Sequence, residues 1–128
     1  MPVFEDTTLT NELSSDDIAA IEALPIGSAL LLVLKGPGQG ARFLLREDTI
    51  IVGRHPQSGI FLDDITVSRS HVKFTKDQGS FSVEDLGSLN GTYVGRQLLR
   101  GSRLLRNGDE VQIGKYKMIY FFGTTGTE

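Results

Sequence analysis

The stretch Thr49-Ile50-Ile51-Val52-Gly53-Arg54 is an apolar strand pattern that ends on an arginine, and the polar residues after it predict a loop. Two short strings follow in order, Ser68-Arg69-Ser70-His71 and Asn90-Gly91. Each string is a weak signal alone, because Gly-Arg and Asn-Gly usually mark only a turn. Their order and spacing within one β-rich segment together predict a phosphate site built from loops.

The residue types in these strings suit a phosphate group. The guanidinium of Arg54, at the end of a strand, is expected to be exposed and to fork onto phosphate oxygens. Ser68 and Arg69 lie in a second loop, where a hydroxyl and a second cation complete the site. Asn90 lies in a third loop, where its amide can hold the backbone of a ligand. These residues predict a reader of phosphothreonine and not an enzyme.

The pattern resembles the forkhead-associated (FHA) family, in which Gly-Arg, Ser-x-x-His and Asn-Gly follow one another, and the resemblance covers residues 29–122. It implies that Arg54 and Ser68 hold the phosphate, that Arg69 assists, and that Asn90 contacts the backbone of a bound peptide. It implies structural roles, in loop shape and tight backbone geometry, for His71, Gly53 and Gly91.

The rest of the sequence predicts an all-β domain, an FHA-type antiparallel β-sandwich of about eleven short strands. Apolar or alternating runs recur at intervals of about ten residues, with turn signals between them. Residues 14–24 are an exception, because capping serines and one apolar face predict a short helix that ends at Pro25. The expected strands are Ala29–Lys35, Ala41–Leu45, Thr49–Val52, Ile60–Leu62, Val72–Lys76, Ser80–Asp85, Tyr93–Val94, Gln97–Leu98, Glu110–Ile113 and Lys115–Phe122.

Length and composition predict one domain with two tails. The chain has 128 residues, of which 39% are hydrophobic, enough for one core. We expect a flexible acidic tail over residues 1–27, an FHA domain over residues 28–123 and a short C-terminal tail over residues 124–128. The sequence shows no signal peptide pattern and no apolar run long enough to cross a bilayer, so we expect a cytoplasmic monomer that does not bind membranes.

The charge of the chain is unevenly distributed. Residues 1–27 contain six acidic residues and no Lys or Arg, whereas the remainder contains thirteen basic and ten acidic residues. Within the acidic segment, Thr7 and Thr8 follow two carboxylates and predict a site for a Ser/Thr kinase. The 21 residues from Thr8 to Ala29 would span roughly 25 Å as a flexible linker, enough for a phosphate to reach Arg54 and Ser68 of the same chain.

Tail and domain together resemble the actinobacterial glycogen accumulation regulator and oxoglutarate dehydrogenase inhibitor type. The resemblance is carried by residues 24–31, 60–69, 87–94 and 107–115. It implies a protein that binds and inhibits 2-oxoglutarate dehydrogenase and modulates glutamate-metabolising enzymes. It further implies that a Ser/Thr kinase phosphorylates a tail threonine, after which the FHA domain binds its own phosphorylated tail and releases these enzymes.

The sequence departs from this family at two places. Ser70 stands where close relatives often have a basic residue, which removes one positive charge beside the site. The tail reads Glu-Asp-Thr-Thr-Leu-Thr where relatives more often read Glu-Thr-Thr-Ser. The modified residue is therefore Thr8 or Thr7, with Thr8 preferred.

Two other functions fit parts of the sequence. An adaptor that recruits phosphorylated partners needs the same phosphate site but has no effect on metabolic enzymes. A Ser-dependent hydrolase would use Ser68 and His71 with Asp63, Asp64 or Asp85, but the Gly-x-Ser-x-Gly turn of many such enzymes is missing.

Metal, cofactor and nucleic-acid binding are not expected. The chain has two histidines and no cysteine, which argues against a zinc site. The glycine-rich run of residues 36–40 lacks the Gly-Lys-Ser/Thr ending of a nucleotide-binding loop, so it predicts a hairpin turn. Four arginines form a basic group near the C-terminal end: Arg96, Arg100, Arg103 and Arg106. Because no exposed aromatic residues are interleaved with them, the group predicts a solvated edge or a protein-docking surface and not a nucleic-acid site.

Overall fold

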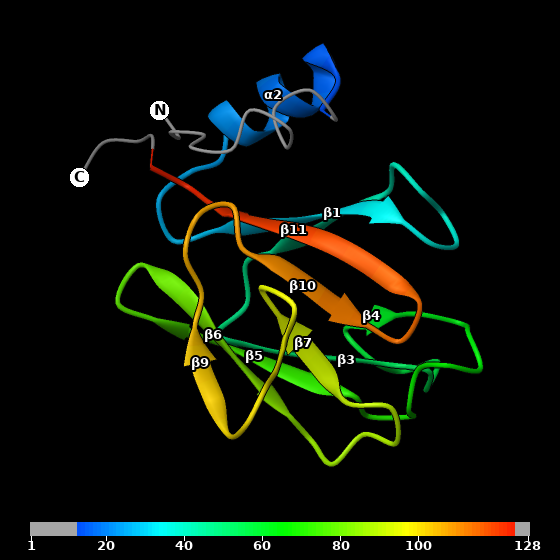
Figure 1. Cartoon of the computed structure of the whole chain (residues 1–128). Helices are drawn as coiled ribbons and strands as arrows, with labels where there is room; N and C mark the ends of the chain where they lie inside the picture. Colours follow the sequence, from blue (N-terminus) through cyan, green and yellow to red (C-terminus); the bar gives the residue numbers. More distant parts are fainter. Residues whose placement is uncertain (1–12, 125–128) are drawn as a thin grey trace.

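The short strands form two β-sheets that pack face to face, with one helix on the outer side (Figure 1). This architecture comes from a computed structural model that describes residues 13–124. The six-stranded sheet contains, in spatial order, β2 (Arg42–Leu45), β1 (Ala29–Lys35), β11 (Tyr116–Phe122), β10 (Glu110–Ile113), β7 (Thr92–Val94) and β8 (Gln97–Leu98). The five-stranded sheet contains β4 (Ile60–Phe61), β3 (Thr49–Gly53), β5 (Val72–Asp77), β6 (Ser80–Asp85) and β9 (Ser102–Leu104).

The predicted β-sandwich is confirmed, with two differences. The β3 and β4 strands pair in parallel, Val52 with Ile60 and Gly53 with Phe61, so the five-stranded sheet is mixed and not purely antiparallel. Strand β9 was not predicted, because all three of its residues are exposed and show no alternation. It forms nevertheless, because its backbone pairs with β6, where Val83 lies opposite Arg103.

Alternation along the strands explains the core between the sheets. In β5, Val72 and Phe74 are buried while the residues between and after them are more accessible. Strand β1 instead has five consecutive buried residues, Ala29–Val33. Leu31 and Val33 belong to the core between the sheets, whereas Leu30 and Leu32 pack on the opposite side. A strand that is buried on both faces needs a second covering layer, and the helix supplies it.

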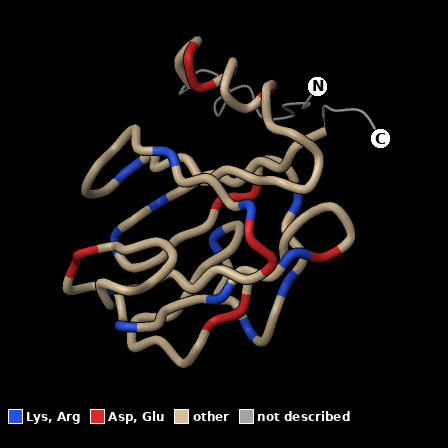
Figure 2. The backbone as a smooth tube through the Cα atoms, turned by 180° about the vertical axis from the view of Figure 1, so that it is seen from behind, with Lys and Arg blue, Asp and Glu red and all other residues tan. Residues whose placement is uncertain are grey.

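That helix, α2 (Ser15–Glu22), begins at a capping box in which Ser14 and Asp17 exchange hydrogen bonds. Figure 2 shows acidic positions and no basic ones along it. Its apolar face, with Ile21 1% exposed, packs on β1 and β11. The prediction of a short helix is therefore correct, but the expectation that residues 1–27 are flexible throughout is wrong for residues 13–27, because burial of apolar groups holds this segment on the sheet.

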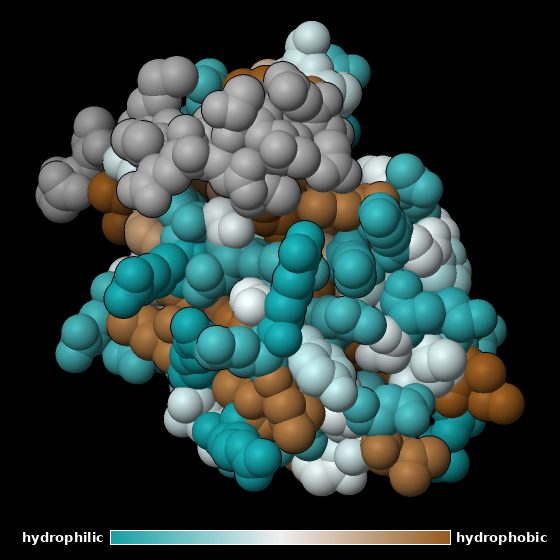
Figure 3. Space-filling model, in the orientation of Figure 1, coloured by the Kyte–Doolittle hydropathy of each residue, from teal (hydrophilic) through white to brown (hydrophobic). Residues whose placement is uncertain are grey.

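The surface has no single dominant apolar face in the view of Figure 3, where apolar patches lie apart among polar side chains. Helix α2 has only eight residues, and none of the helices within residues 13–124 is long and apolar enough to cross a bilayer.

The loops that follow β3, β4, β6 and β10 are joined by hydrogen bonds at one end of the sandwich, and they contain the predicted site.

Candidate functional site

The first loop of the site follows β3 and lies tightly against the second. The Arg54 N–H donates to the Ser68 carbonyl at 2.9 Å, and the His55 N–H donates to the Arg69 carbonyl at 3.2 Å. A Cβ on Gly53 would collide with the backbone of Arg69, so only glycine permits this approach. Gly53 thereby brings Arg54 next to Ser68 and Arg69, which lie 14 and 15 positions later in the sequence.

The side chain of Arg54 is held by one of its three nitrogens. Its Nε donates to the Val67 carbonyl at 3.0 Å, and the side chain is otherwise exposed. An end-on fork onto an anion uses the two Nη nitrogens. The contact with Val67 therefore orients the guanidinium without using the atoms that such a fork requires.

Ser68 presents its hydroxyl at the junction of the second and third loops. The Leu89 N–H donates to Ser68 Oγ at 3.0 Å, which fixes the position of the oxygen. A hydroxyl that accepts a hydrogen bond still has its proton to donate, so Ser68 can donate to an anion. The neighbouring Arg69 is exposed and adds a second guanidinium to this side of the site.

His71 is fully buried and connects the second loop to the third. The Ser68 N–H donates to His71 Nδ1 at 3.0 Å, and His71 Nε2 lies 2.9 Å from the Gly91 carbonyl. Because Nδ1 accepts, this pairing assigns the proton to Nε2, which donates to Gly91. Gly91 itself has φ +81°, and a Cβ there would press on Leu98. Both residues thus shape the loops.

Asn90 already uses part of its hydrogen-bonding capacity within the protein. Its Nδ2 donates to the Thr66 carbonyl at 2.9 Å. A carboxamide carries two donor hydrogens and one acceptor oxygen, so one hydrogen and Oδ1 stay available for a ligand's backbone. We use the term anion site for the four residues that these loops bring together: Arg54, Ser68, Arg69 and Asn90.

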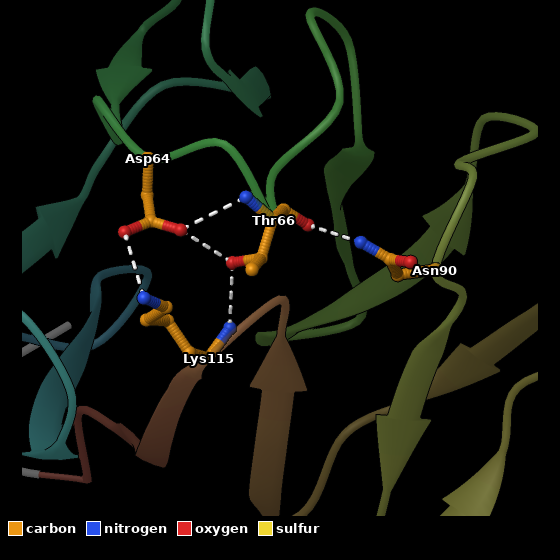
Figure 4. Close-up of polar contacts among 4 residues, drawn as sticks. All are labelled: Asp64, Thr66, Asn90 and Lys115. Atoms are coloured by element: carbon orange, nitrogen blue, oxygen red, sulfur yellow. Dashed lines mark hydrogen bonds and ion pairs between the residues drawn. The ribbon is translucent and has the colours of Figure 1, made fainter.

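A polar cluster that the sequence did not reveal supports the anion site from beside Asn90 (Figure 4). Asp64 Oδ1 accepts from the Thr66 hydroxyl at 2.6 Å and from the Thr66 N–H at 2.9 Å, and Thr66 Oγ1 accepts from the Lys115 N–H. The Lys115 ammonium lies 3.8 Å from Asp64 Oδ2. Hydrogen bonds from the Thr66 hydroxyl and N–H, and then the charge of Lys115, outweigh partial burial and lower the pKa of Asp64.

The third loop is held by Asp85, at the end of β6. Its carboxylate accepts from the hydroxyls of Ser88 and Thr92 at 2.6 Å each, and from the N–H groups of Gly87 and Ser88 at 2.8 Å. Burial alone would raise the pKa of Asp85, but the hydrogen bonds from Ser88, Thr92 and Gly87 outweigh it and lower the pKa. An aspartate that binds the N–H groups two and three residues later is a turn signal, which was available in the sequence.

Ser68, His71 and Asp85 are not arranged as a hydrolytic triad. Both ring nitrogens of His71 contact backbone groups, and Ser68 Oγ bonds the Leu89 N–H. Asp85 bonds its own loop and Thr92. A triad requires the serine hydroxyl on one imidazole nitrogen and a carboxylate on the other.

A shallow depression of about 380 Å³ adjoins the anion site. It shares Asn90 with that site and continues toward the β10–β11 turn. The depression is lined by Thr66, Asn90, Gly91, Tyr93, Gln112, Gly114 and Lys115. An extended peptide held at Asn90 can therefore place a further side chain here. The predicted phosphorylation sites Thr7 and Thr8 lie outside the described residues.

Comparisons with known proteins agree with this architecture. The family model for the FHA domain matches residues 50–114, a range that contains all four residues of the anion site. A solved structure described as a structural and functional analysis of phosphothreonine-dependent FHA domain interactions superimposes with a TM-score of 0.67 at 29% identity, covering 78% of this chain and 99% of that one.

Two curated relatives are similar over most of the chain. The oxoglutarate dehydrogenase inhibitor of Corynebacterium efficiens is 57% identical over 100 residues, which cover 78% of this chain and 70% of the relative. The glycogen accumulation regulator GarA of Mycolicibacterium smegmatis is 55% identical over 106 residues, which cover 83% of this chain and 66% of the relative. The matched fold, motif order and level of identity establish that this chain belongs to the FHA domain family.

Proposed function

We propose that this protein is a phosphothreonine-binding regulator of metabolic enzymes. The observation that carries the proposal is the convergence of three loops, joined by hydrogen bonds, on Arg54, Ser68 and Asn90. The Nη atoms of Arg54, the Ser68 hydroxyl and the Arg69 guanidinium would donate to phosphate oxygens, as charge-assisted hydrogen bonds. Asn90 would hold the peptide backbone beside the phosphothreonine.

The proposed targets are 2-oxoglutarate dehydrogenase and glutamate-metabolising enzymes, which the unphosphorylated protein would bind and inhibit or modulate. The similarity to the oxoglutarate dehydrogenase inhibitor of Corynebacterium efficiens supports this proposal. Ile65 and Leu89, which are 88% and 90% exposed next to the anion site, offer apolar contacts to a partner. We place this function in a monomer in the cytoplasm.

The proposed switch is phosphorylation of Thr8, or of Thr7, by a Ser/Thr protein kinase. The phosphothreonine would bind the anion site of its own chain and so displace the target enzymes. The acidic context of both threonines and the excess of basic residues in the rest of the chain favour this intramolecular binding.

The test is isothermal titration of the full unphosphorylated chain with a peptide of residues 3–12 that carries phosphate on Thr8, on Thr7 or on neither. We expect binding of one phosphopeptide with a dissociation constant on the order of micromolar, and at least a tenfold loss in Arg54→Ala and in Ser68→Ala. Arg103→Ala, in the exposed strand β9, is the matched control and should bind normally. Absence of binding by both phosphopeptides would contradict the proposal.

A second assay separates a metabolic regulator from an adaptor. The activity of the 2-oxoglutarate dehydrogenase complex is measured with the unphosphorylated chain and with the chain phosphorylated at Thr8. We expect inhibition by the first and recovery of activity with the second. Phosphopeptide binding without any effect on the enzyme would instead identify an adaptor.

A further inference from the structure

Two of the three asparagines in this chain are followed by glycine, at Asn90-Gly91 and Asn107-Gly108. Asparagine is a thermolabile residue, because the carbon of its carboxamide can be attacked by the amide nitrogen of the next residue. A following glycine favours this attack, since it has no Cβ to hinder the approach or to restrict the backbone. The two dipeptides therefore have similar intrinsic reactivity, and the folded structure is what distinguishes them.

Strand β11 holds both reacting groups of Asn107-Gly108. The Gly108 N–H donates to the Tyr120 carbonyl at 2.7 Å. Asn107 Oδ1 accepts from the Phe122 N–H at 2.8 Å. Both hydrogen bonds would have to break before the Gly108 nitrogen could reach Asn107 Cγ. A hydrogen bond donated by the neutral amide also makes that amide a weaker acid, so the fold protects this dipeptide from the reaction.

The fold gives Asn90-Gly91 no comparable protection. The dipeptide lies in the loop between β6 and β7, and the Asn90 side chain is exposed. Within residues 13–124, the Gly91 N–H makes no hydrogen bond. The Asn90 carboxamide is held at Nδ2, by the Thr66 carbonyl at 2.9 Å, which leaves the Gly91 nitrogen free to act (Figure 4).

We propose that Asn90 is a site of spontaneous deamidation, and that its conversion to aspartate or isoaspartate inactivates the anion site. The Gly91 nitrogen loses its proton to solvent and bonds to Asn90 Cγ. The bond from Cγ to Nδ2 breaks, and Nδ2 takes up a proton and leaves as ammonia. Water then opens the succinimide ring: addition at Cγ gives aspartate, and addition at the main-chain carbonyl carbon gives isoaspartate.

Either product damages the anion site, a consequence that rests on the proposed function. Aspartate replaces the Nδ2 donor by a carboxylate oxygen, which faces the Thr66 carbonyl and adds a negative charge where a phosphate would bind. Isoaspartate adds one carbon to the main chain, and so displaces the Gly91 carbonyl that lies 2.9 Å from His71 Nε2. Because His71 also accepts from the Ser68 N–H, this displacement reaches the second loop.

The test is to age the full chain in buffer at pH 8 and to follow each asparagine by peptide mass spectrometry. In the folded chain we expect Asn90 to deamidate at least about tenfold faster than Asn107, because two hydrogen bonds hold the second dipeptide. The same chain unfolded in guanidinium is the matched control, and there the two rates should be similar. Equal rates in the folded chain, or a faster reaction of Asn107, would overturn the proposal.

The aged samples are then titrated with peptides of residues 3–12 that carry phosphothreonine at position 8 or at position 7. We expect the fraction of binding-competent protein to fall in step with the loss of Asn90, and Asn90→Asp to bind at least about tenfold more weakly. Asn107→Asp, whose carboxylate can still accept from the Phe122 N–H, is the matched control and should bind normally. Full binding by a chain in which Asn90 is converted would overturn the proposal. Failure of the fresh chain to bind either peptide would overturn the proposed function, and the rate comparison would still decide whether Asn90 is the reactive site.

Protection by the ligand gives an independent readout. A peptide backbone held on Asn90 Oδ1 and on the second Nδ2 hydrogen would keep the carboxamide from reacting. A saturating phosphopeptide should therefore slow the loss of Asn90 and leave the rate at Asn107 unchanged, whereas the unphosphorylated peptide should change neither rate. No protection by a phosphopeptide that binds would show that the ligand does not use Asn90, and would overturn the claim that deamidation inactivates the site.

Discussion

Single residues determine whether the loops of the anion site can meet. Gly53 lets the backbones of Arg54 and Arg69 approach, and the buried imidazole of His71 satisfies the Ser68 N–H and the Gly91 carbonyl at once. Neither residue is needed as a phosphate ligand. The order of the sequence motifs identified both residues. Apart from the contact of His71 with Ser68, however, their physical roles depend on groups that lie 15 or more residues away along the chain.

We predict that the Gly53→Ala protein still folds but binds the phosphopeptide more weakly. The added Cβ collides with the Arg69 backbone, so the second loop must move away from Arg54. We expect destabilisation of about 1–3 kcal/mol and at least a tenfold loss of affinity. Denaturant unfolding and titration with the phosphopeptide measure the two effects, and Ser58→Ala in the same loop is the control. Unchanged affinity in a folded Gly53→Ala protein would refute the prediction.

Some strands and loops are positioned by signals that are local in the sequence, and others by contacts between residues that are far apart in the sequence. Most strands were predicted within a residue at each end, because alternation is a local signal. Strand β9 has no apolar residue facing inward, and it forms because β6 lies beside it. Thr66 was not identified as part of the site, since its partners Asp64 and Lys115 come from two loops. The turn pattern of Asp64 was local, but its contact with Lys115 was not.

The third loop should lose its anchor in acid. The folded-state pKa of Asp85 is lowered, so its carboxylate adds stability above the unfolded value of 3.8, and this stability is lost as pH falls through the folded pKa. Asp85→Asn should reduce the free energy of unfolding by about 1–3 kcal/mol at neutral pH. The difference from the unmodified protein should shrink below about pH 4.

Unfolding experiments from pH 7 to pH 2.5 measure this difference, with Asp77→Asn, at the exposed end of β5, as the control. A difference that stays constant over this range would show that the charge of Asp85 does not stabilise the loop.

At the scale of the whole molecule, a pair of buried hydroxyl groups, on Tyr120 and Ser80, connects the two sheets. The Tyr120 hydroxyl is 2.8 Å from Ser80 Oγ, which also donates to the Leu105 carbonyl at 2.9 Å. Burial raises the pKa of Tyr120 to about 12, against the lowering effect of its hydrogen bonds with Ser80 and Phe81. Tyr116 also has a raised pKa, through burial and the charges of Asp64 and Asp63.

We therefore predict a loss of stability in alkali. Because the folded pKa of Tyr120 is raised, its contribution is fully present below the unfolded value of 10.0 and is lost as pH rises toward about 12. Tyr120→Phe should cost about 1 kcal/mol at pH 8 but show a shallower decline above pH 10. Free energies of unfolding from pH 8 to 11.5 test this, with Tyr93→Phe as the control. An equally steep decline in Tyr120→Phe would contradict the prediction.

The sequence by itself determined the fold class and most strand positions, and it predicted the residues that the three loops bring together at the candidate site, because alternation, turn residues and motif order lie in short segments. Only the tertiary structure decided that β4 pairs in parallel, that α2 covers β1 and β11, and that Thr66 joins Asn90 to Lys115. These features depend on contacts between distant parts of the chain. Local composition does not specify such contacts, since several apolar faces compete to be buried and only the packed whole selects among them.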